Sequence, residues 1–212
     1  MTKNTADHLR MRLKQARQSM VVADRQRASL LLRARLFTWL ATARTACQDA
    51  GNAPPQIVAG FWPLADEPDL RELYRQWHGS GIVVALPVMQ AADQPLTFRT
   101  WQPESTLASA QFGVLEPIDG QTVQPDLVIV PTLGFTSRGD RLGYGKGFYD
   151  RTLAHLRTLG GPLTAIGVAW DEGNLLAIEP NYQPSAHDER LDAVLTPTDW
   201  HPESPAFGAS LS

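Results

Sequence analysis

The residues best suited to chemistry gather in one short segment, residues 138–151, which reads RGDRLGYGKGFYDR. Three of its glycines stand at alternate positions: Gly143, Gly145 and Gly147. Glycine has no Cβ, so backbone N–H groups in such a loop can approach a phosphate closely. Arg141, Lys146 and Arg151 add positive charge, and Asp150 adds a carboxylate that can hold a cation beside phosphates. The segment is therefore a candidate site for the phosphates of a nucleotide.

The flanking sequence predicts how this segment is positioned. Residues 126–130 form a short apolar run between two prolines, which is typical of a buried strand, and residues 148–159 repeat apolar side chains at helical spacing. The order strand, loop, helix places the positive end of a helix beside the glycines. Such loops are often only tight turns, and the spacing fits neither a Walker loop nor a dinucleotide fingerprint. The four charged side chains within eleven residues favour phosphate binding.

Charge is distributed unevenly along the 212 residues. Residues 1–44 hold ten Lys and Arg and two acids, a balance of +8, whereas residues 45–212 have a balance of −11. A basic segment on an acidic body requires an anionic partner or a solvated face. Few aromatic residues accompany the positive charges, so an RNA-binding or membrane-surface helix is the weaker interpretation.

Helical spacing in residues 1–50 predicts two helices that form a hairpin with one apolar face. The first carries Leu9 and Leu13, and the second carries Leu36 and Leu40. Most of the arginines are interpreted as a solvated helix face. Arg10 is the exception, because a nucleotide at the glycine loop needs positive charge nearby.

The single cysteine, Cys47, excludes an internal disulfide and a cysteine-cluster zinc site, which suits a reducing compartment. No apolar run reaches the length of a membrane span, and the N-terminus lacks the apolar core of a signal peptide. We therefore expect a cytoplasmic protein of one domain with no membrane partner.

Residues 56–197 have the pattern of an α/β body. Buried strands are expected at the apolar runs in residues 56–62, 82–86, 96–101, 126–130, 163–169 and 191–196. A helix around Leu73 and Trp77 separates the first two, which favours parallel pairing in a layered sheet. Ligands gather at the carboxyl ends of such strands, where Glu67 stands, although a solvated Glu in the first turn of a helix explains it equally. Residues 102–125 are expected to cross the surface, residues 171–186 to form a polar connection, and residues 198–212 to be a frayed tail.

Four pieces in a set order resemble the 5-formyltetrahydrofolate cyclo-ligase family, also known as methenyltetrahydrofolate synthetases. They are a basic helix with Leu9-Arg10, the run FWPLADE at residues 61–67, the glycine-rich segment, and IGVAW at residues 166–170 followed by HD and LDAVLTP. The motif RLGxGxGFYDR is the specific part. The expected fold is an α/β three-layer sandwich with a mostly parallel central sheet, like that of sugar-phosphate isomerases and CoA transferases, with the helical hairpin in front.

The resemblance implies an ATP- and Mg²⁺-dependent ring closure. ATP phosphorylates the formyl oxygen of 5-formyltetrahydrofolate, N10 of the folate attacks, and 5,10-methenyltetrahydrofolate, ADP and phosphate result. Such chemistry needs positioning and charge neutralisation more than a protein nucleophile, which fits the lack of a Ser-His-Asp or Cys-His constellation. The expected partners are small molecules, with no nucleic acid, and we expect a monomer.

The resemblance also assigns roles to residues. It places Arg141 and Lys146 in catalysis and Glu67 and Phe148 against the folate. Asp150 and Asp188 are the implied Mg²⁺ ligands, since oxygen ligands suit that ion. The residues implied in ATP binding are Arg10, Arg141, Leu142, Gly143, Tyr144, Gly145, Lys146, Gly147, Phe148 and Tyr149.

Three positions depart from the usual pattern of the family. Ala6 stands where a Lys or Arg is usual, which leaves Lys3 as a candidate substitute. Thr136 replaces a common Asp, and a Gln common after residues 163–169 is missing. These departures leave open a folate or nucleotide sensor without turnover, and the layered α/β pattern by itself leaves open a sugar-phosphate isomerase or CoA-transferase-like enzyme. The sensor predicts binding without ATP consumption, and the isomerase-like enzyme predicts no need for ATP or Mg²⁺.

Overall fold

The computed structural model describes residues 3–207, with side chains from residue 5 onward. The α-helices are α1 (Lys3–Ser19), α2 (Val22–Asp49), α3 (Arg71–Gly79), α4 (Phe148–Thr158) and α5 (Leu175–Ile178), with short 3-10 turns η1 (Gln111–Gly113) and η2 (Asp171–Gly173). The main sheet contains β1 (Ile57–Ala59), β2 (Val83–Val88), β3 (Thr97–Trp101), β6 (Thr122–Val123), β7 (Leu127–Pro131), β10 (Thr164–Val168), β11 (Ala193–Leu195) and β12 (Trp200–His201). Two small ribbons pair β4 (Leu107–Ser109) with β5 (Leu115–Pro117) and β8 (Gly134–Phe135) with β9 (Arg141–Leu142).

The main sheet has the strand order β12-β11-β10-β7-β1-β2-β3-β6. The five central strands are parallel, and β12, β3 and β6 are antiparallel at the two sides. The β7 strand pairs with β10 from Leu127 opposite Thr164 to Pro131 opposite Val168. The mostly parallel sheet predicted from the sequence is confirmed.

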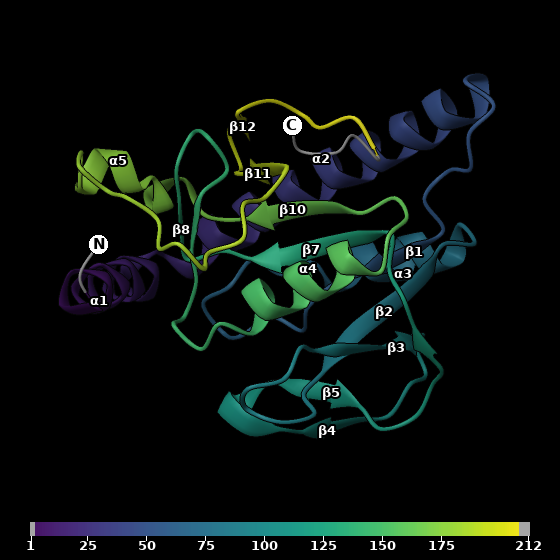
Figure 1. Cartoon of the computed structure of the whole chain (residues 1–212), viewed down its shortest axis with the longest axis horizontal. Coiled ribbons are helices and arrows are strands. Elements are labelled where there is room, and N and C mark those ends of the chain that lie inside the picture. Colours follow the sequence, from purple (N-terminus) through teal and green to yellow (C-terminus); the bar gives the residue numbers. More distant parts are fainter. Residues whose placement is uncertain (1–2, 208–212) are drawn as a thin grey trace.

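Helices cover both faces of the sheet, because alternate strand residues point to opposite sides. Leu127 and Ile129 of β7 belong to an apolar cluster with α2 and α3, whereas Val128 and Val130 pack toward α4. In Figure 1, α4 lies in front of the sheet and α2 and α3 lie behind it. The three-layer arrangement buries the central strands on both faces, as their continuous apolar sequences predict.

The two predicted N-terminal helices are present, but the single apolar face predicted for them is wrong. Leu9 and Leu13 of α1 pack with Leu142 of β9 and with α5, whereas Leu36 of α2 packs on the sheet. Figure 1 shows α1 end-on at one side of the molecule, while α2 runs behind the sheet. Only Met20 and Val21 join the helices, and the chain changes direction there.

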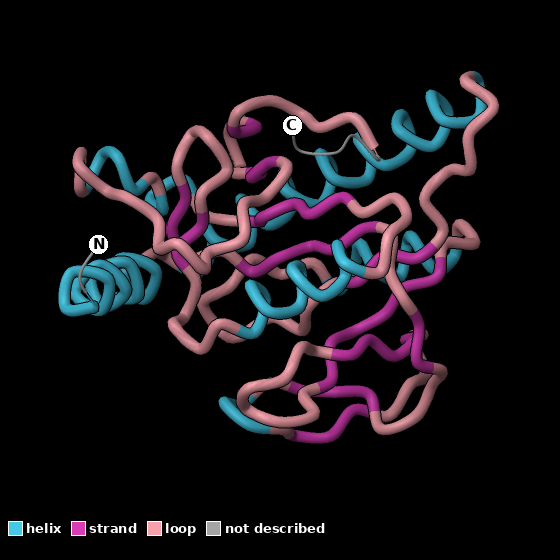
Figure 2. Tube along the Cα trace, in the orientation of Figure 1, coloured by secondary structure: helices cyan, strands magenta, loops and turns pink. Residues whose placement is uncertain are grey.

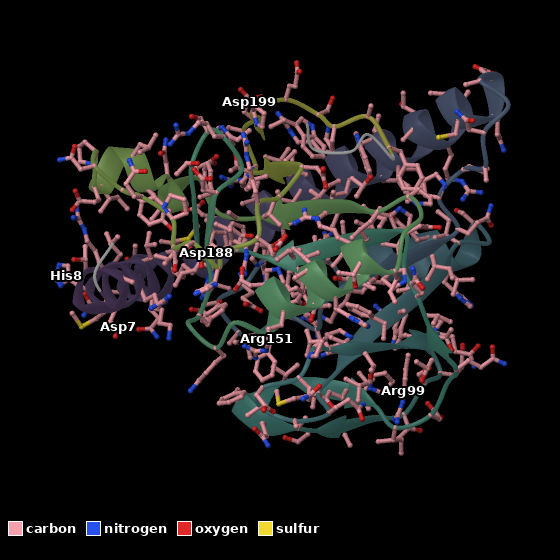
Figure 3. The ribbon with its side chains drawn as sticks, in the orientation of Figure 1. Asp7, His8, Arg99, Arg151, Asp188 and Asp199 are labelled. Atoms are coloured by element: carbon pink, nitrogen blue, oxygen red, sulfur yellow. The ribbon has the colours of Figure 1, made fainter. Side chains whose placement is uncertain are left out.

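Three segments predicted without structure contain short elements. The 102–125 excursion forms the β4–β5 ribbon and β6. Arg99 of β3, labelled in Figure 3, donates to the carbonyl of Pro117 in this ribbon over 3.1 Å. The 171–186 connection contains α5. The predicted frayed tail is wrong for residues 198–207, because β12 joins the sheet and Trp39 donates to the carbonyl of Pro205. Residues 208–212 lie outside the described part.

The loops and ribbons that border the cleft described below lie at one end of the sheet. The arrows of β7 and β10 in Figure 1 point toward α1, and Figure 2 shows the following segments, largely loop, gathered there. Ligands of parallel sheets bind at this edge. Within residues 3–207, no helix is both long and apolar enough to cross a membrane.

The packing of α2 makes a prediction with a control on the same helix. Leu36 is fully buried and Leu30 is 57% exposed. We expect Leu36→Ala to lower the free energy of unfolding by about 2–5 kcal/mol, because it leaves a cavity under the sheet, and Leu30→Ala to change it by less than about 0.5 kcal/mol. Urea unfolding measures both, and equal losses would contradict this packing.

Candidate active site

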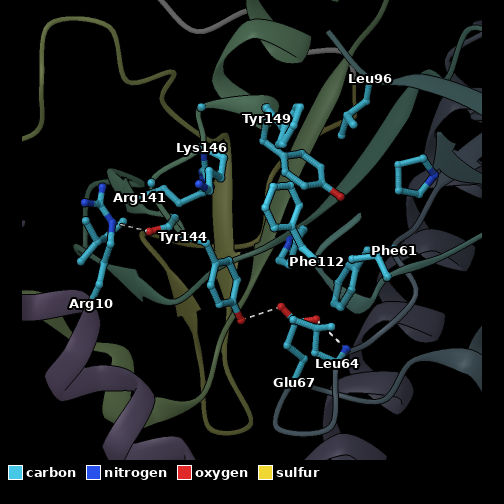
Figure 4. A pocket seen from close by; sticks show the side chains of 18 of the residues that line it. Arg10, Phe61, Leu64, Glu67, Leu96, Phe112, Arg141, Tyr144, Lys146 and Tyr149 are labelled. Carbon is cyan, nitrogen blue, oxygen red and sulfur yellow. Dashed lines mark hydrogen bonds between the residues drawn. The ribbon is translucent and has the colours of Figure 1, made fainter. Parts of the chain in front are cut away.

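One cleft of about 600 Å³ contains the predicted site residues. All of them line it: Arg10, Glu67, Arg141, Leu142, Gly143, Tyr144, Gly145, Lys146, Gly147, Phe148, Tyr149, Asp150 and Asp188. Figure 4 shows Arg10 on one side and Glu67 on the other, with Tyr144 between them. The fold therefore gathers side chains that are far apart in sequence around one space.

The glycine-rich loop leads from the β8–β9 ribbon into α4. Gly145 and Gly147 have φ angles of +88° and +69°, a region that side chains with a Cβ rarely occupy. Gly147 precedes the first turn of α4, whose free N–H groups face the loop end. A Cβ on Gly143 would collide with the guanidinium of Arg141. The glycines are thus required by backbone geometry and by close approach of an arginine.

Several cations lie on or beside this loop. The Nε of Arg10 donates to the carbonyl of Gly143 over 2.9 Å, and its Nη1 pairs with Asp7 at 2.8 Å. Arg141 is buried and pairs with Asp150 at 2.7 Å, while its Nε has no hydrogen-bond partner within the described chain. Lys146 is exposed. The loop therefore combines fixed and solvent-facing positive charge, which suits a polyanionic ligand.

The two predicted metal ligands lie at the same cleft. The Oδ1 of Asp150 accepts from Arg141 and from the N–H of Glu189, whereas its Oδ2 has no hydrogen-bond partner among the described residues. Asp188 is exposed, and its Oδ2 accepts from the N–H of Ser185. No group of three or more acidic, His or Cys side chains is gathered for a metal within the described residues. One or two carboxylates beside phosphates are what Mg²⁺ ordinarily uses, so this donor set fits that ion.

Glu67 is a buried carboxylate rather than a solvated residue of a helix. It lies in the loop before α3 and is 8% exposed. Its Oε1 accepts from the hydroxyl of Tyr144 over 2.6 Å, and its Oε2 accepts from the N–H of Leu64 over 2.9 Å. Burial raises the pKa of Glu67, and these hydrogen bonds oppose that rise. Burial also raises the pKa of Tyr144 well above its usual value, so its hydroxyl stays a donor.

The loop around Glu67 is held by α2. Arg25 donates to the carbonyl of Ala65 over 3.3 Å, and Arg33 donates to the carbonyl of Asp69 over 3.0 Å. The hydroxyl of Ser29 accepts from the N–H of Asp69. The interpretation of the arginines as a solvated face is therefore wrong for Arg25 and Arg33, which hold the loop of a site residue.

Arg17 is a buried residue that supports the cleft from behind Tyr144, and sequence reasoning missed it. It is 3% exposed and donates to the carbonyl of Thr132 and to the hydroxyl of Tyr144. A signal was present, because Arg17 follows Leu13 by four residues and so lies on the apolar stripe of α1.

Aromatic side chains form the remaining walls. Phe112, from the surface excursion, lies with its ring centroid 6.4 Å from that of Phe148, and its φ of +61° is unusual for a residue with a side chain. Trp62 and Tyr149 also line the cleft. Of these four aromatic residues, the sequence predicted only Phe148 and Tyr149. Phe112 was missed because the surface excursion lacks a periodic pattern.

The three departures from the family pattern lie outside the lining of the cleft. Ala6 is buried in the apolar cluster of α1, and the side chain of Lys3 is not among those described. Thr136 donates to Asp140 within the turn of the β8–β9 ribbon. The connection in which the common Gln is missing begins at Trp170, which donates to the carbonyl of Asp66. Ala6, Thr136 and Trp170 do not contribute to the cleft wall.

A cation-flanked glycine loop faces a buried carboxylate across one cleft at the edge of a parallel sheet, and this arrangement is typical of α/β enzymes. The model of the 5-formyltetrahydrofolate cyclo-ligase family matches residues 2–197, and the chain belongs to this family. Its activity is 5-formyltetrahydrofolate cyclo-ligase activity in folate one-carbon metabolism, and it is an ATP-dependent ligase. The resemblance inferred from the motifs is confirmed.

Individual relatives agree with this assignment. The chain is 31% identical to 5-formyltetrahydrofolate cyclo-ligase of Mycolicibacterium smegmatis over 206 residues, covering 93% of this chain and 96% of that protein. It superimposes on the 5,10-methenyltetrahydrofolate synthetase of Aquifex aeolicus with a TM-score of 0.70 at 22% identity, covering 98% and 96%. It superimposes on the 5,10-methenyltetrahydrofolate synthetase of Mycoplasma pneumoniae with a TM-score of 0.69 at 18% identity, covering 91% of this chain and 98% of that protein. These two structures support the fold.

Glycine geometry predicts a loss of ATP affinity in one of two matched variants. Gly145 and Gly160 have φ angles of +88° and +74°, but a Cβ meets Arg10 at 3.0 Å only at Gly145. We expect both alanine variants to lose about 1 kcal/mol of stability and Gly145→Ala alone to weaken ATP binding about tenfold or more. Calorimetry with ATP tests this, and equal affinities in the two variants would contradict it.

Proposed function

We propose that this chain performs the ring closure with ATP and Mg²⁺ in this single cleft, with the glycine loop at the phosphate end and Glu67 at the folate end. The observation that carries the proposal is the hydrogen bond between Tyr144, a residue of that loop, and Glu67. This bond joins the two predicted ligand sites, so a phosphate and a folate bound there would be neighbours.

At the phosphate end, the residues we assign to ATP are Arg10 and residues 141–149. Backbone N–H groups and the first turn of α4 offer donors, and Arg141 and Lys146 supply charge that would stabilise the transferring phosphoryl group. The pairing of Arg141 with Asp150 fixes the guanidinium before a ligand arrives. Phosphoryl transfer depends mainly on such positioning.

Asp150 and Asp188 are the residues that would hold Mg²⁺ beside these phosphates. The unpartnered Oδ2 of Asp150 and the exposed carboxylate of Asp188 support this assignment. When bound, the ion would neutralise charge on the phosphate oxygens.

At the folate end, the Glu67 carboxylate would accept hydrogen bonds from N–H groups of the pterin. Phe148 would pack on the ring system, and Phe112 adds a second aromatic face. A buried acceptor of fixed orientation discriminates strongly against molecules that cannot donate to it.

The reaction then proceeds by two bond changes on the substrate. The formyl oxygen takes the γ-phosphoryl group of ATP, which releases ADP and leaves an iminium phosphate. N10 attacks the formyl carbon, the carbon–oxygen bond breaks, phosphate departs, and the proton of N10 is lost to water. No protein nucleophile is needed, because the nucleophile is the substrate's own nitrogen. Monomeric state and a cytoplasmic location stay predictions from the sequence.

The test is the rise in methenyltetrahydrofolate absorbance when the protein meets 5-formyltetrahydrofolate, ATP and Mg²⁺. We expect the rise to require ATP and to disappear with EDTA. No rise, with both substrates still binding in calorimetry, would contradict turnover and favour a sensor. A rise without ATP would contradict the phosphoryl-transfer route.

The metal assignment predicts the behaviour of one carboxylate variant. We expect Asp150→Asn to lower kcat about 100-fold or more and to raise the Mg²⁺ concentration needed for half-maximal rate, because the carboxylate that would hold the ion is neutralised. Asp119→Asn, at an exposed position outside the cleft, is the control. An unchanged Mg²⁺ dependence in Asp150→Asn would remove this residue from the metal site.

A further inference from the structure

Arg17 is a buried cation without a salt bridge. It is 3% exposed, and no carboxylate of the described chain lies close enough to pair with it. Burying a guanidinium is costly unless its donors are satisfied. A role in the solvated face of α1 is therefore excluded, and the contacts of Arg17 must account for its place in the fold.

Those contacts fix the direction of a short hydrogen-bond chain. The Nη1 of Arg17 donates to the hydroxyl of Tyr144 over 2.9 Å, and its Nη2 donates to the carbonyl of Thr132. A guanidinium has no acceptor, so the Tyr144 oxygen must accept. The single hydrogen of that hydroxyl is then left for Glu67, whose Oε1 lies 2.6 Å away.

The chain ends on a carboxylate that needs such support. The second oxygen of Glu67 accepts from the N–H of Leu64, so each oxygen has one donor and the carboxylate plane is fixed. Glu67 lines the cleft, whereas Arg17 does not. The hydrogen bonds of Arg17 therefore reach the cleft-lining side chains through Tyr144 and, beyond it, Glu67.

We propose that Arg17 is a positioning residue, which orients the Glu67 carboxylate toward the cleft through Tyr144 and whose positive charge favours the ionised form of that carboxylate over the protonated one. The kinetic consequences rest on the proposed role of Glu67 in folate binding, but the state of the carboxyl group itself does not. Lys14, from the same helix, lies over the Tyr144 ring at 5.3 Å and supports its placement from the solvent side.

Other groups around Glu67 influence its ionisation, some favouring the charged form and others opposing it. Asp66, next to it, opposes ionisation, and burial does so more strongly, whereas the Tyr144 hydrogen bond and the charge of Arg17 favour ionisation. Burial, and after it the charge of nearby Glu67, raise the pKa of the Tyr149 phenol of α4, so this phenol stays neutral.

On the α2 side, Arg25, Arg33 and Asp69 border a second hollow that Glu67 also lines. The two arginines donate to backbone carbonyls, and Asp69 pairs with Arg71. Among the described residues, Arg17 is therefore the only cation joined to Glu67 through a hydrogen-bonded side chain.

The first test needs no substrate. The carboxyl band of Glu67 is the infrared band that disappears in Glu67→Gln, and its protonation midpoint is followed against pH. Removing a cation favours the protonated acid, so we expect a higher midpoint in Arg17→Met than in the unchanged protein. Arg12→Met, which removes an exposed cation of the same helix, should leave the midpoint unchanged.

The second test uses kinetics with both substrates. We expect Arg17→Met to raise KM for 5-formyltetrahydrofolate on the order of tenfold and KM for ATP less, with the acid limb of kcat/KM moved to higher pH. Arg17→Lys should recover part of this loss. If Arg17→Met fails to fold, Tyr144→Phe breaks the same chain and should also raise the midpoint.

The outcomes separate this proposal from the proposed function. An equal midpoint in Arg17→Met and the unchanged protein overturns the proposal, as does an equal loss at every pH with both KM values changed alike. Absence of cyclisation by the unchanged protein overturns the catalytic account, and the infrared titration still decides the role of Arg17.

Discussion

The cleft depends on the packing of α1 against the β8–β9 ribbon. The apolar stripe of α1 packs on Leu142, the residue just before the glycine loop. That contact brings Arg10 to the carbonyl of Gly143 and Arg17 to the hydroxyl of Tyr144. Burial of apolar side chains stabilises this contact, and the hydrogen bonds of the two arginines fix the position of α1 along the glycine loop. Loss of this packing would release the loop and Glu67 together.

The basic N-terminal segment has a structural explanation in its contacts. Six of its arginines donate to backbone carbonyl oxygens elsewhere in the chain: Arg10, Arg17, Arg25, Arg33, Arg35 and Arg44. Arginine suits this task, because its planar fork offers several donors and remains charged at all working pH values. The helices thus hold loops that border or support the cleft. The positive charge of residues 1–44 therefore serves largely in contacts within the molecule.

Sequence patterns were sufficient for the layered sheet and for most of the cleft. Apolar strands between prolines, and glycines followed by a helix, depend on local geometry that residue types determine. The α1–α2 arrangement could not be predicted, because helical periodicity identifies an apolar stripe but not the surface that covers it. Arg17 was missed because arginine is usually exposed, and Phe112 was missed because its place depends on a ribbon whose strands are only three residues long. Tertiary contacts decided each of these cases.

The central claim is that ATP and formylfolate meet in this cleft and that the formyl oxygen receives the phosphoryl group. The most direct measurement uses 5-formyltetrahydrofolate labelled with oxygen-18 in the formyl group and follows the label by mass spectrometry. The account predicts that each released phosphate carries one labelled oxygen, because the formyl oxygen leaves with it. Unlabelled phosphate, formed together with methenyltetrahydrofolate, would contradict the account.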